Sequence, residues 1–500
     1  MPISTAVDPA QVSRVVGIET NFVNLNVGAV NYLPQRIAVV GQGSTASTYS
    51  LTKAQVFSPD AVGATYGYGS PLHLAVRQLL PVSGDGVGNI PVTVYPLEDN
   101  ASGVVGTGDI EATVTTAAAA TYWVKVNNVL SQAFNVAVGD VAGDVHDKIK
   151  VALDASVSLP ILAGTVGSDV PVTSKWKGAS AGDVVIEIVG PTDKGVTFAI
   201  TQLASAAVNP NAAEINAALA QIGNVWETLV LNLLDVADTT ALDTYAAFGE
   251  GRWGALVNKP LLVFSGDTNA TVAAAIAVPD ARKTDRVNCQ LVSPGSNDLP
   301  FVSAARQLAR IAVTAQKNPP RDYGSQIATG LTAGIDSVQW NGSQREAAVL
   351  GGSSTVQPAD GVLKMSDTIT FYHPSGEAVP PYRFVCDHVK LWQVLYNLDL
   401  IFNNPNWDGA PLVPDGQAHT NPDAKRPSTA VAAVAALIDS LGRAAIISDP
   451  ETAKESIQAG ISESNGKRLD ISLVIQLAGN ANIISITNNF GFFFGTVEAA

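Results

Sequence analysis

Residues 468–495 read RLDISLVIQLAGNANIISITNNFGFFFG and combine two apolar extended segments with a polar loop between them. In the first segment, residues 469–477, large aliphatic side chains alternate with mostly polar ones, a period of two that predicts a strand with one buried face. Gly479-Asn480-Ala481-Asn482 forms the loop, and a second extended segment is predicted after it. The apolar positions are Leu469, Ile471, Leu473, Ile475 and Leu477 in the first segment, and Ile483, Ile484, Ile486, Phe490, Phe492, Phe493 and Phe494 in the second.

This second segment needs a partner, because an unpaired strand edge exposes backbone donors and acceptors together with apolar side chains. The residues alone leave two interpretations open. In one, the segment closes the protein's own sheet as an ordinary hairpin. In the other, it adds as a strand to the sheet of another copy of the chain, which would make assembly the function.

Length and composition limit the classes of protein. The 500 residues predict two to four domains, and 46% hydrophobic against 15% charged residues supply ample material for their cores. A formal net charge of −15 without any run of Lys and Arg argues against direct binding to nucleic acid or to an anionic membrane. The sequence begins without a secretion signal, and no apolar run reaches membrane-spanning length. We therefore expect a protein made in a cytoplasm, with no membrane insertion.

The order of predicted elements indicates an α/β core interrupted by a β-rich insertion. Buried β-rich runs such as RIAVV at 36–40 alternate with amphipathic helices, which predicts a sheet covered on both faces by helices. After Glu98 charge drops and short strands dominate, which predicts a mostly antiparallel module. The predicted parts are an N-terminal extended arm at 1–31, the α/β core at 32–99 and 209–360, the inserted β-rich domain at 100–208, a C-terminal α+β domain at 361–478 and a C-terminal arm at 479–500.

Some local predictions concern turns, caps and one histidine. Residues 361–365 and 368–372 are expected to pair as a hairpin around Ser366-Asp367. His146, between two aspartates, is expected on a solvated face. The predicted helix caps are Asn297 or Asp298 for the helix at 299–316 and Ser428 for the helix at 429–441.

A glycine-rich turn offers the main alternative function. IAVVGQGSTAS at 37–47 looks like the strand and turn of a dinucleotide site, with Gly41 and Gly43 at suitable spacing. The context fails, since a Ser/Thr-rich loop follows where a phosphate-binding helix should begin. We expect these glycines to form a turn that requires positive φ. A cytoplasmic α/β enzyme that binds a nucleotide at Gly41-Gln42-Gly43 is the competing hypothesis.

Two other motifs also lack the context for catalysis. Gly178 to Gly182 matches G-x-S-x-G, but the sequence that follows Ser180 predicts a strand instead of the helix of a nucleophile elbow. Cys386-Asp387-His388 combines nucleophile, acid and base types, yet neighbours on a helix point in different directions. The two cysteines, Cys289 and Cys386, and the scattered histidines give no disulfide framework and no metal spacing. We expect no enzyme activity, no metal and no cofactor.

Three stretches together resemble the contractile-tail sheath proteins of Mu-like bacteriophages, the myovirus and R-type tailocin sheath family. YLPQRIAVVGQG at 32–43 resembles the start of that family's first domain, and DTITFY at 367–372, followed by a long helix, resembles its middle section. Residues 426–494 resemble its C-terminal region, from Pro-Ser-Thr opening a helix to the Arg-Leu-Asp strand. Residues 101–208 match only as a variable inserted domain.

The resemblance implies a non-enzymatic virion protein with a subtilisin-like core fold and no catalysis. Such subunits assemble in the host bacterial cytoplasm as stacked hexameric rings around a tail tube protein, in contact with baseplate and tail terminator proteins. It also implies that the arms of neighbouring copies add strands to one another's C-terminal sheet. The residues assigned on this basis are Val23, Leu25, Val27, Ile483, Ile484, Ile486, Phe490 and Phe492 as arm strands, and Leu469, Ile471, Leu473 and Ile475 as the receiving strand. A lattice with two arrangements also needs hinges that keep its subunits linked, and our hypothesis places them at Gly28 and Gly479.

Overall fold

The computed structural model describes residues 30–204, 208–359, 362–377, 380–488 and 490. The chain divides into two compact units, a larger one of residues 32–395 and 477–500 and a smaller one of residues 1–31 and 396–476. The fold is mixed α/β with several sheets, as the sequence predicts.

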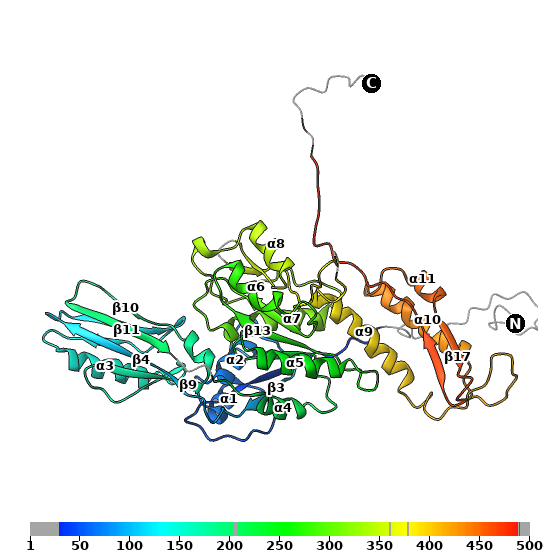
Figure 1. Cartoon of the computed structure of the whole chain (residues 1–500), viewed down its shortest axis with the longest axis horizontal. Helices are drawn as coiled ribbons and strands as arrows, with labels where there is room; N and C mark the ends of the chain where they lie inside the picture. The colour runs from blue at the N-terminus through cyan, green and yellow to red at the C-terminus, as the bar shows by residue number, and fades with distance from the viewer. Residues whose placement is uncertain (1–29, 205–207, 360–361, 378–379, 489, 491–500) are drawn as a thin grey trace, which may run out of the picture. The chain divides into compact units, whose positions relative to one another are not determined.

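A six-stranded sheet forms the centre of the larger unit (Figure 1). Its order is β14-β13-β12-β1-β3-β2, and all neighbouring pairs are parallel except β2 with β3. Every residue of the five parallel strands is buried, because helices cover both faces of such a sheet. The strands are β1 (Ile37–Gln42), β2 (Ala54–Val56), β3 (Val92–Leu97), β12 (Leu229–Asn232), β13 (Leu262–Asp267) and β14 (Asn288–Val292).

Two pairs of helices cover the two faces. On one face, Ile215 of α4 (Ala212–Ala220) and Tyr245 of α5 (Thr239–Arg252) pack with Ala38 and other alternate sheet residues. On the opposite face, α2 and α7 pack against each other and against the sheet (Figure 1). The bounds of this pair are α2 (Pro71–Leu79) and α7 (Pro300–Lys317). The unit also contains α1 (Pro59–Tyr66), α6 (Val272–Asp280) and α8 (Gly342–Leu350).

Two four-stranded antiparallel sheets lie between β3 and α4 in the sequence, with the orders β10-β5-β6, in which β7 also pairs with β5, and β11-β4-β9-β8. Helix α3 (Ala142–Asp154) packs against strands of both sheets. His146 of this helix is 2% exposed, and its Nε2 accepts the Ala112 N–H at 2.8 Å, so the prediction of a solvated face is wrong. The strands are β4 (Val105–Val114), β5 (Ala120–Val126), β6 (Val129–Leu130), β7 (Phe134–Val136), β8 (Ile161–Ala163), β9 (Val170–Lys177), β10 (Ile186–Val189) and β11 (Val196–Ala204).

The hairpin predicted around Ser366-Asp367 is wrong. Strand β16 (Val362–Met365) pairs instead with the preceding β15 (Val356–Ala359). Thr370 bridges to Cys289, which places this segment beside β14. Burial decides the pairing, because Phe371 is fully buried in a cluster with Val236 and Leu242 that the predicted hairpin would not offer.

Both predicted helix caps are also corrected. Leu299 occupies the N-cap of α7 and makes no side-chain cap bond, while Asp298 pairs with Arg306. Ser428 lies inside α10, and its N–H and hydroxyl both donate to Oδ1 of Asp415, which comes from the preceding loop. In each case the predicted capping residue makes a polar contact with another side chain and does not cap its helix.

The smaller unit packs two helices with a two-stranded antiparallel sheet. Helix α9 contributes residues to both units. No helix among the described residues combines the length and apolarity that a membrane crossing requires. The elements are α9 (Val385–Phe402), α10 (Pro427–Arg443), α11 (Pro450–Glu455), β17 (Gln458–Ile461) and β18 (Leu469–Ser472).

Candidate assembly site

The C-terminal hairpin keeps an incompletely covered apolar face. Strand β18 pairs with β17 in the register Ile461 with Leu469 and Ala459 with Ile471. The strand ends at Ser472, so the prediction that it extends to Leu477 is wrong. The predicted alternation nevertheless continues, since Leu469, Ile471, Leu473 and Ile475 are half-buried and the residues between them are exposed. A two-stranded sheet of this size cannot bury its own face.

Side chains satisfy part of the backbone beyond β18. The Val474 N–H donates to Ser456 Oγ at 2.9 Å, and the Ser456 hydroxyl donates to Val474 O at 3.1 Å. The Ser448 N–H donates to Gln476 O at 2.9 Å. Residues 473–476 are therefore held extended without ladder pairing.

The segment after the polar loop exposes large apolar side chains. Ile483 is 91% exposed, Ile484 75% and Ile486 82%, while Phe490 is 79% exposed. Residues 483–488 belong to none of the described strands. Exposed isoleucines at this density are what a partner surface would cover.

The other predicted assembly residues are placed only in part. Val23, Leu25, Val27, Gly28 and Phe492 lie outside the described residues, so their roles stay predictions. Gly479 has open space around the position of a Cβ atom, and its role as a hinge also stays a prediction.

The sequence did not predict a polar contact of the residues just before this segment, Ala478 and Asn480, with a buried lysine. Lys390 of α9 is fully buried, and its Nζ donates to Ala478 O at 2.6 Å and to Asn480 Oδ1 at 2.5 Å. A lone lysine in the apolar run VKLWQVLY was the available signal, because a buried ammonium needs designated partners.

The predicted turn at Gly41-Gln42-Gly43 is wrong, since Gly41 and Gln42 belong to β1, and the space beside the two glycines is filled by the protein's own side chains. A Cβ on Gly41 would collide with Leu233, and one on Gly43 would collide with the Tyr49 ring. Neither glycine has a positive φ, so the prediction that the backbone conformation requires glycine here is wrong. Close packing of Leu233 and Tyr49 is what leaves no room for a side chain. After Gly43 the chain continues as a loop, and α1 begins only at Pro59. The end of β1 therefore does not lead directly into a helix N-terminus that could bind a phosphate.

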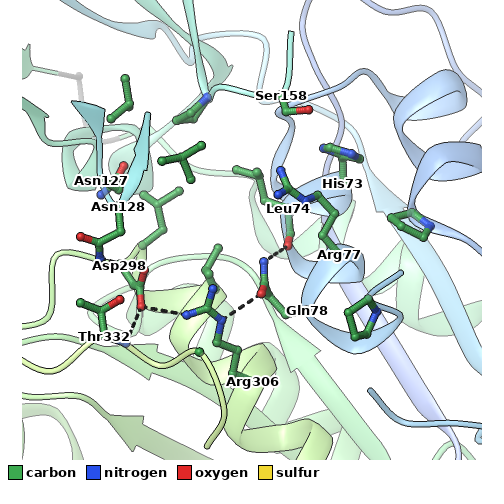
Figure 2. A pocket seen from close by; sticks show the side chains of 18 of the residues that line it. His73, Leu74, Arg77, Gln78, Asn127, Asn128, Ser158, Asp298, Arg306 and Thr332 are labelled. Atoms are coloured by element: carbon green, nitrogen blue, oxygen red, sulfur yellow. Dashed lines mark hydrogen bonds and ion pairs between the residues drawn. The ribbon is translucent and has the colours of Figure 1, made fainter. Parts of the chain in front are cut away.

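A cavity of about 750 Å³ lies between α2, the turn after β5 and the start of α7. Figure 2 shows Arg306 at its edge, with Nη1 at 3.3 Å from Asp298 Oδ2 and Nε donating to Gln78 Oε1 at 2.9 Å. Asn128 Nδ2 donates to the other oxygen of Asp298 at 3.0 Å. These contacts tie the inserted sheets to the core and give both Asp298 and Arg306 partners within the protein.

The remaining motifs also have structural roles. Ser180 Oγ accepts the Trp176 indole N–H at 2.9 Å, and strand β10 follows the short 3-10 helix that carries this serine. Burial raises the pKa of the Cys386 thiol, and burial lowers the pKa of His388 to about 4. Asp387 Oδ1 accepts from Lys390 at 2.8 Å and lies 3.8 Å from the Cys386 Sγ. Among the described residues, no group of three His, Cys, Asp or Glu is placed to hold a metal ion.

A fold with an incompletely covered C-terminal sheet and an exposed apolar segment is that of a protein suited to self-association. The chain is 23% identical over 268 residues to the Mu-like prophage FluMu tail sheath protein of Haemophilus influenzae. The alignment covers 52% of this chain and 53% of that protein, so the chain spans about half the length of the curated relative it matches. The resemblance to Mu-like sheath proteins is thereby confirmed. No protein-family model matches the chain.

Solved structures of sheath proteins also align with this chain. A sheath tail protein from Listeria innocua aligns with a TM-score of 0.49 and 11% identity, covering 91% of this chain and 94% of that one. The helical sheath of the anti-feeding prophage in its contracted state aligns with a TM-score of 0.48 and 11% identity, covering 96% and 99%.

Proposed function

We propose that this chain is a structural subunit of a contractile phage tail sheath. It polymerises as stacked hexameric rings around a tail tube and contracts to drive the tube through a host envelope. The observation that carries the proposal is the alignment with a Mu-like prophage tail sheath protein. The exposed isoleucines after Asn482 support it, because they give such a subunit an apolar segment with which to join its neighbours.

In this proposal the C-terminal arm of one copy adds a strand to the C-terminal sheet of the next. The receiving face carries Leu469, Ile471, Leu473 and Ile475, and the arm brings Ile483, Ile484 and Ile486. Main-chain pairing supplies affinity, and burial of each isoleucine contributes about 1.5–3 kcal/mol. The residues around Val23 to Val27 act as the N-terminal arm strand.

The rest of the layout follows from the same proposal. The core at 32–99 and 209–360 has the subtilisin-like fold without catalysis, the insertion at 100–208 is an outer domain, and 361–478 and 479–500 are the C-terminal domain and arm. Tube, baseplate and terminator proteins are the partners, and assembly takes place in the host cytoplasm. Contraction then needs no nucleotide, because the energy is stored in a lattice with two arrangements.

Electron microscopy of the purified protein tests this function. Rings or hollow tubes are expected from the whole chain, and a variant lacking residues 483–500 should stay folded and form none. Ile483→Ser with Ile484→Ser and Ile486→Ser should behave like the truncation, while Ser485→Ala with Thr487→Ala is the matched control that still assembles. A discrete monomer whose thermal stability rises with added nucleotide would instead favour the enzyme at Gly41-Gln42-Gly43.

A further inference from the structure

We propose that Lys390 and Asn480 form a clamp that fixes the root of the C-terminal arm to the larger unit, so that the arm is free to move only beyond Asn482. This inference rests on the proposed sheath function and adds the residues that position its arm.

Lys390 uses its whole hydrogen-bonding capacity in this clamp. The side chain is fully buried, and the three bonds of Nζ go to Asp387 Oδ1 at 2.8 Å, Ala478 O at 2.6 Å and Asn480 Oδ1 at 2.5 Å. An ammonium has three donors, so each proton has one acceptor. Because a buried charge without partners is costly, removal of residues 478–480 from this place would leave Lys390 with Asp387 alone.

Asn480 connects the arm to a second part of the larger unit. Its Nδ2 donates to Pro320 O at 2.8 Å, in the loop that follows α7. Its Oδ1 accepts from Lys390 and lies 3.5 Å from the Cys386 Sγ, which also donates to it. One amide side chain thus joins the arm to α9 and to the end of α7, and neither an aspartate nor an alanine could make both kinds of bond.

The clamp changes where the arm can pivot. Gly479 lies between two clamped residues, Ala478 and Asn480, whereas residues 481–488 are exposed. The Asn482 N–H also donates to Asn480 O at 2.9 Å, so the pivot lies after Asn482 instead of at the glycine. Tension on an arm held by a neighbouring subunit passes through Asn480 into α9, and the hairpin of β17 and β18 is not loaded by it.

Spin labelling of the whole chain tests the clamp directly. Ala481→Cys provides a labelling position next to the clamp, and Ser464→Cys provides a control position in the loop between β17 and β18. The native Cys289 and Cys386 are buried and their pKa values are raised, so they stay unlabelled. The immobilised spectral component expected at 481 should be lost in Asn480→Ala, while the spectrum at 464 should not change.

Asn482→Ala is the matched control, because Asn482 is exposed two residues further along the arm. It should leave the spectrum at 481 unchanged. In assembly, Asn480→Ala should raise the protein concentration needed for tubes about tenfold, the loss expected for a hydrogen bond to a charged group. Lys390→Met should act in the same direction, and Asn480→Ala keeps the test valid if Lys390→Met does not fold.

The outcomes separate the clamp from the function it serves. If the unmodified protein forms no rings or tubes, the sheath function fails, and the label at 481 still decides whether the clamp exists. If the unmodified protein assembles but Asn480→Ala changes neither the label mobility nor the assembly concentration, the clamp is overturned. Equal effects from Asn482→Ala would overturn it as well.

Discussion

The central sheet and the C-terminal hairpin use strands in opposite ways. All six residues of β1 are buried, and strands on both sides complete its hydrogen bonding. In β17 and β18 exposed residues alternate with half-buried ones, and no residue is fully buried. A strand with both faces covered thus carries a continuous apolar run, whereas a strand with one face open carries an alternating one. Burial in the single chain therefore indicates which sheet has both of its faces covered.

The largest expected effect on the free energy of unfolding is in the central six-stranded sheet. Phe264 of β13 is fully buried, so Phe264→Ala should lower the free energy of unfolding by about 3–5 kcal/mol through lost burial and a new cavity. Urea denaturation of the variant measures this loss. Phe57→Ala is the matched control, since Phe57 is 80% exposed, and it should have almost no effect. Similar losses from both variants would contradict the contrast in burial.

The second prediction concerns pH dependence in the larger unit. Desolvation, with the nearby Asp235 and Asp267 carboxylates, raises the pKa of Asp183 to about 7. The folded state then holds this proton more tightly than the unfolded state, so stability is present at low pH and is lost as pH rises from about 4 towards 7. Asp183→Asn should make the protein more stable at pH 8 by about 1–3 kcal/mol, since solvent reaches this half-buried group, and should change little at pH 4.

Thermal unfolding at the two pH values measures this difference. Asp243→Asn is a control, because Asp243 is an exposed aspartate paired with Arg282. Equal stabilisation by Asp183→Asn at both pH values would exclude the buried charge as the cause.

The smaller unit should respond to pH with the opposite sign. Hydrogen bonds from the Ser428 hydroxyl and N–H lower the pKa of Asp415 at the start of α10. Its contribution is therefore present at neutral pH and lost as pH falls through the lowered folded-state pKa. Asp415→Ala should reduce the unfolding temperature by about 1–3 °C at pH 7, and the difference should vanish in acid. A difference that persists in acid would show that the carboxylate is not responsible.

The smallest effect on stability is expected in the C-terminal hairpin of β17 and β18. The effect on assembly should be large there. Ile471 is half-buried in β18, so Ile471→Ala should cost below about 1 kcal/mol in the single chain. Tube formation should nevertheless be strongly reduced, because Ile471 belongs to the proposed receiving face. Urea denaturation and electron microscopy of the same preparation measure the two effects, and Ser472→Ala is the control on the exposed side. A loss of stability as large as that of Phe264→Ala would mean that the face is already covered.

Continuous patterns in the sequence predicted the core well. The apolar run at 36–40 became β1, and the stripe predicted for 299–316 became α7, because local pattern and final burial agree there. Strand β9 was missed, since Pro171 and Lys175 interrupt its pattern. The Lys175 ammonium is satisfied by Tyr68 O at 2.8 Å and Val157 O at 2.6 Å, contacts that only the tertiary structure supplies.

In the candidate site, as in the core, the local apolar patterns were predictable and the contacts between distant segments were not. Alternation predicted Leu469 and Ile471 on one face, which the burial pattern confirms, while the role of the isoleucine-rich segment as an arm stays a prediction. The apolar run around Lys390 signalled a buried lysine, but its contact with Asn480 was not predictable, because 90 residues separate the two side chains. Polar contacts between distant segments depend on the completed fold, in the same way as the Asp415 contact with Ser428.

The pairing of β4 with β11 has a consequence for the exchange of modules. These two strands begin and end the inserted sheets, and Thr107 lies opposite Ala204 in their register. The two ends of the insertion are therefore neighbours, and β3 and α4, which flank it, contribute to the same buried cluster. A foreign domain whose own termini are adjacent could replace the insertion without a long linker. The same site offers a place to graft a reporter or binding domain, provided that the contacts between the insertion and the core, such as Lys175 with Tyr68 O, are replaced.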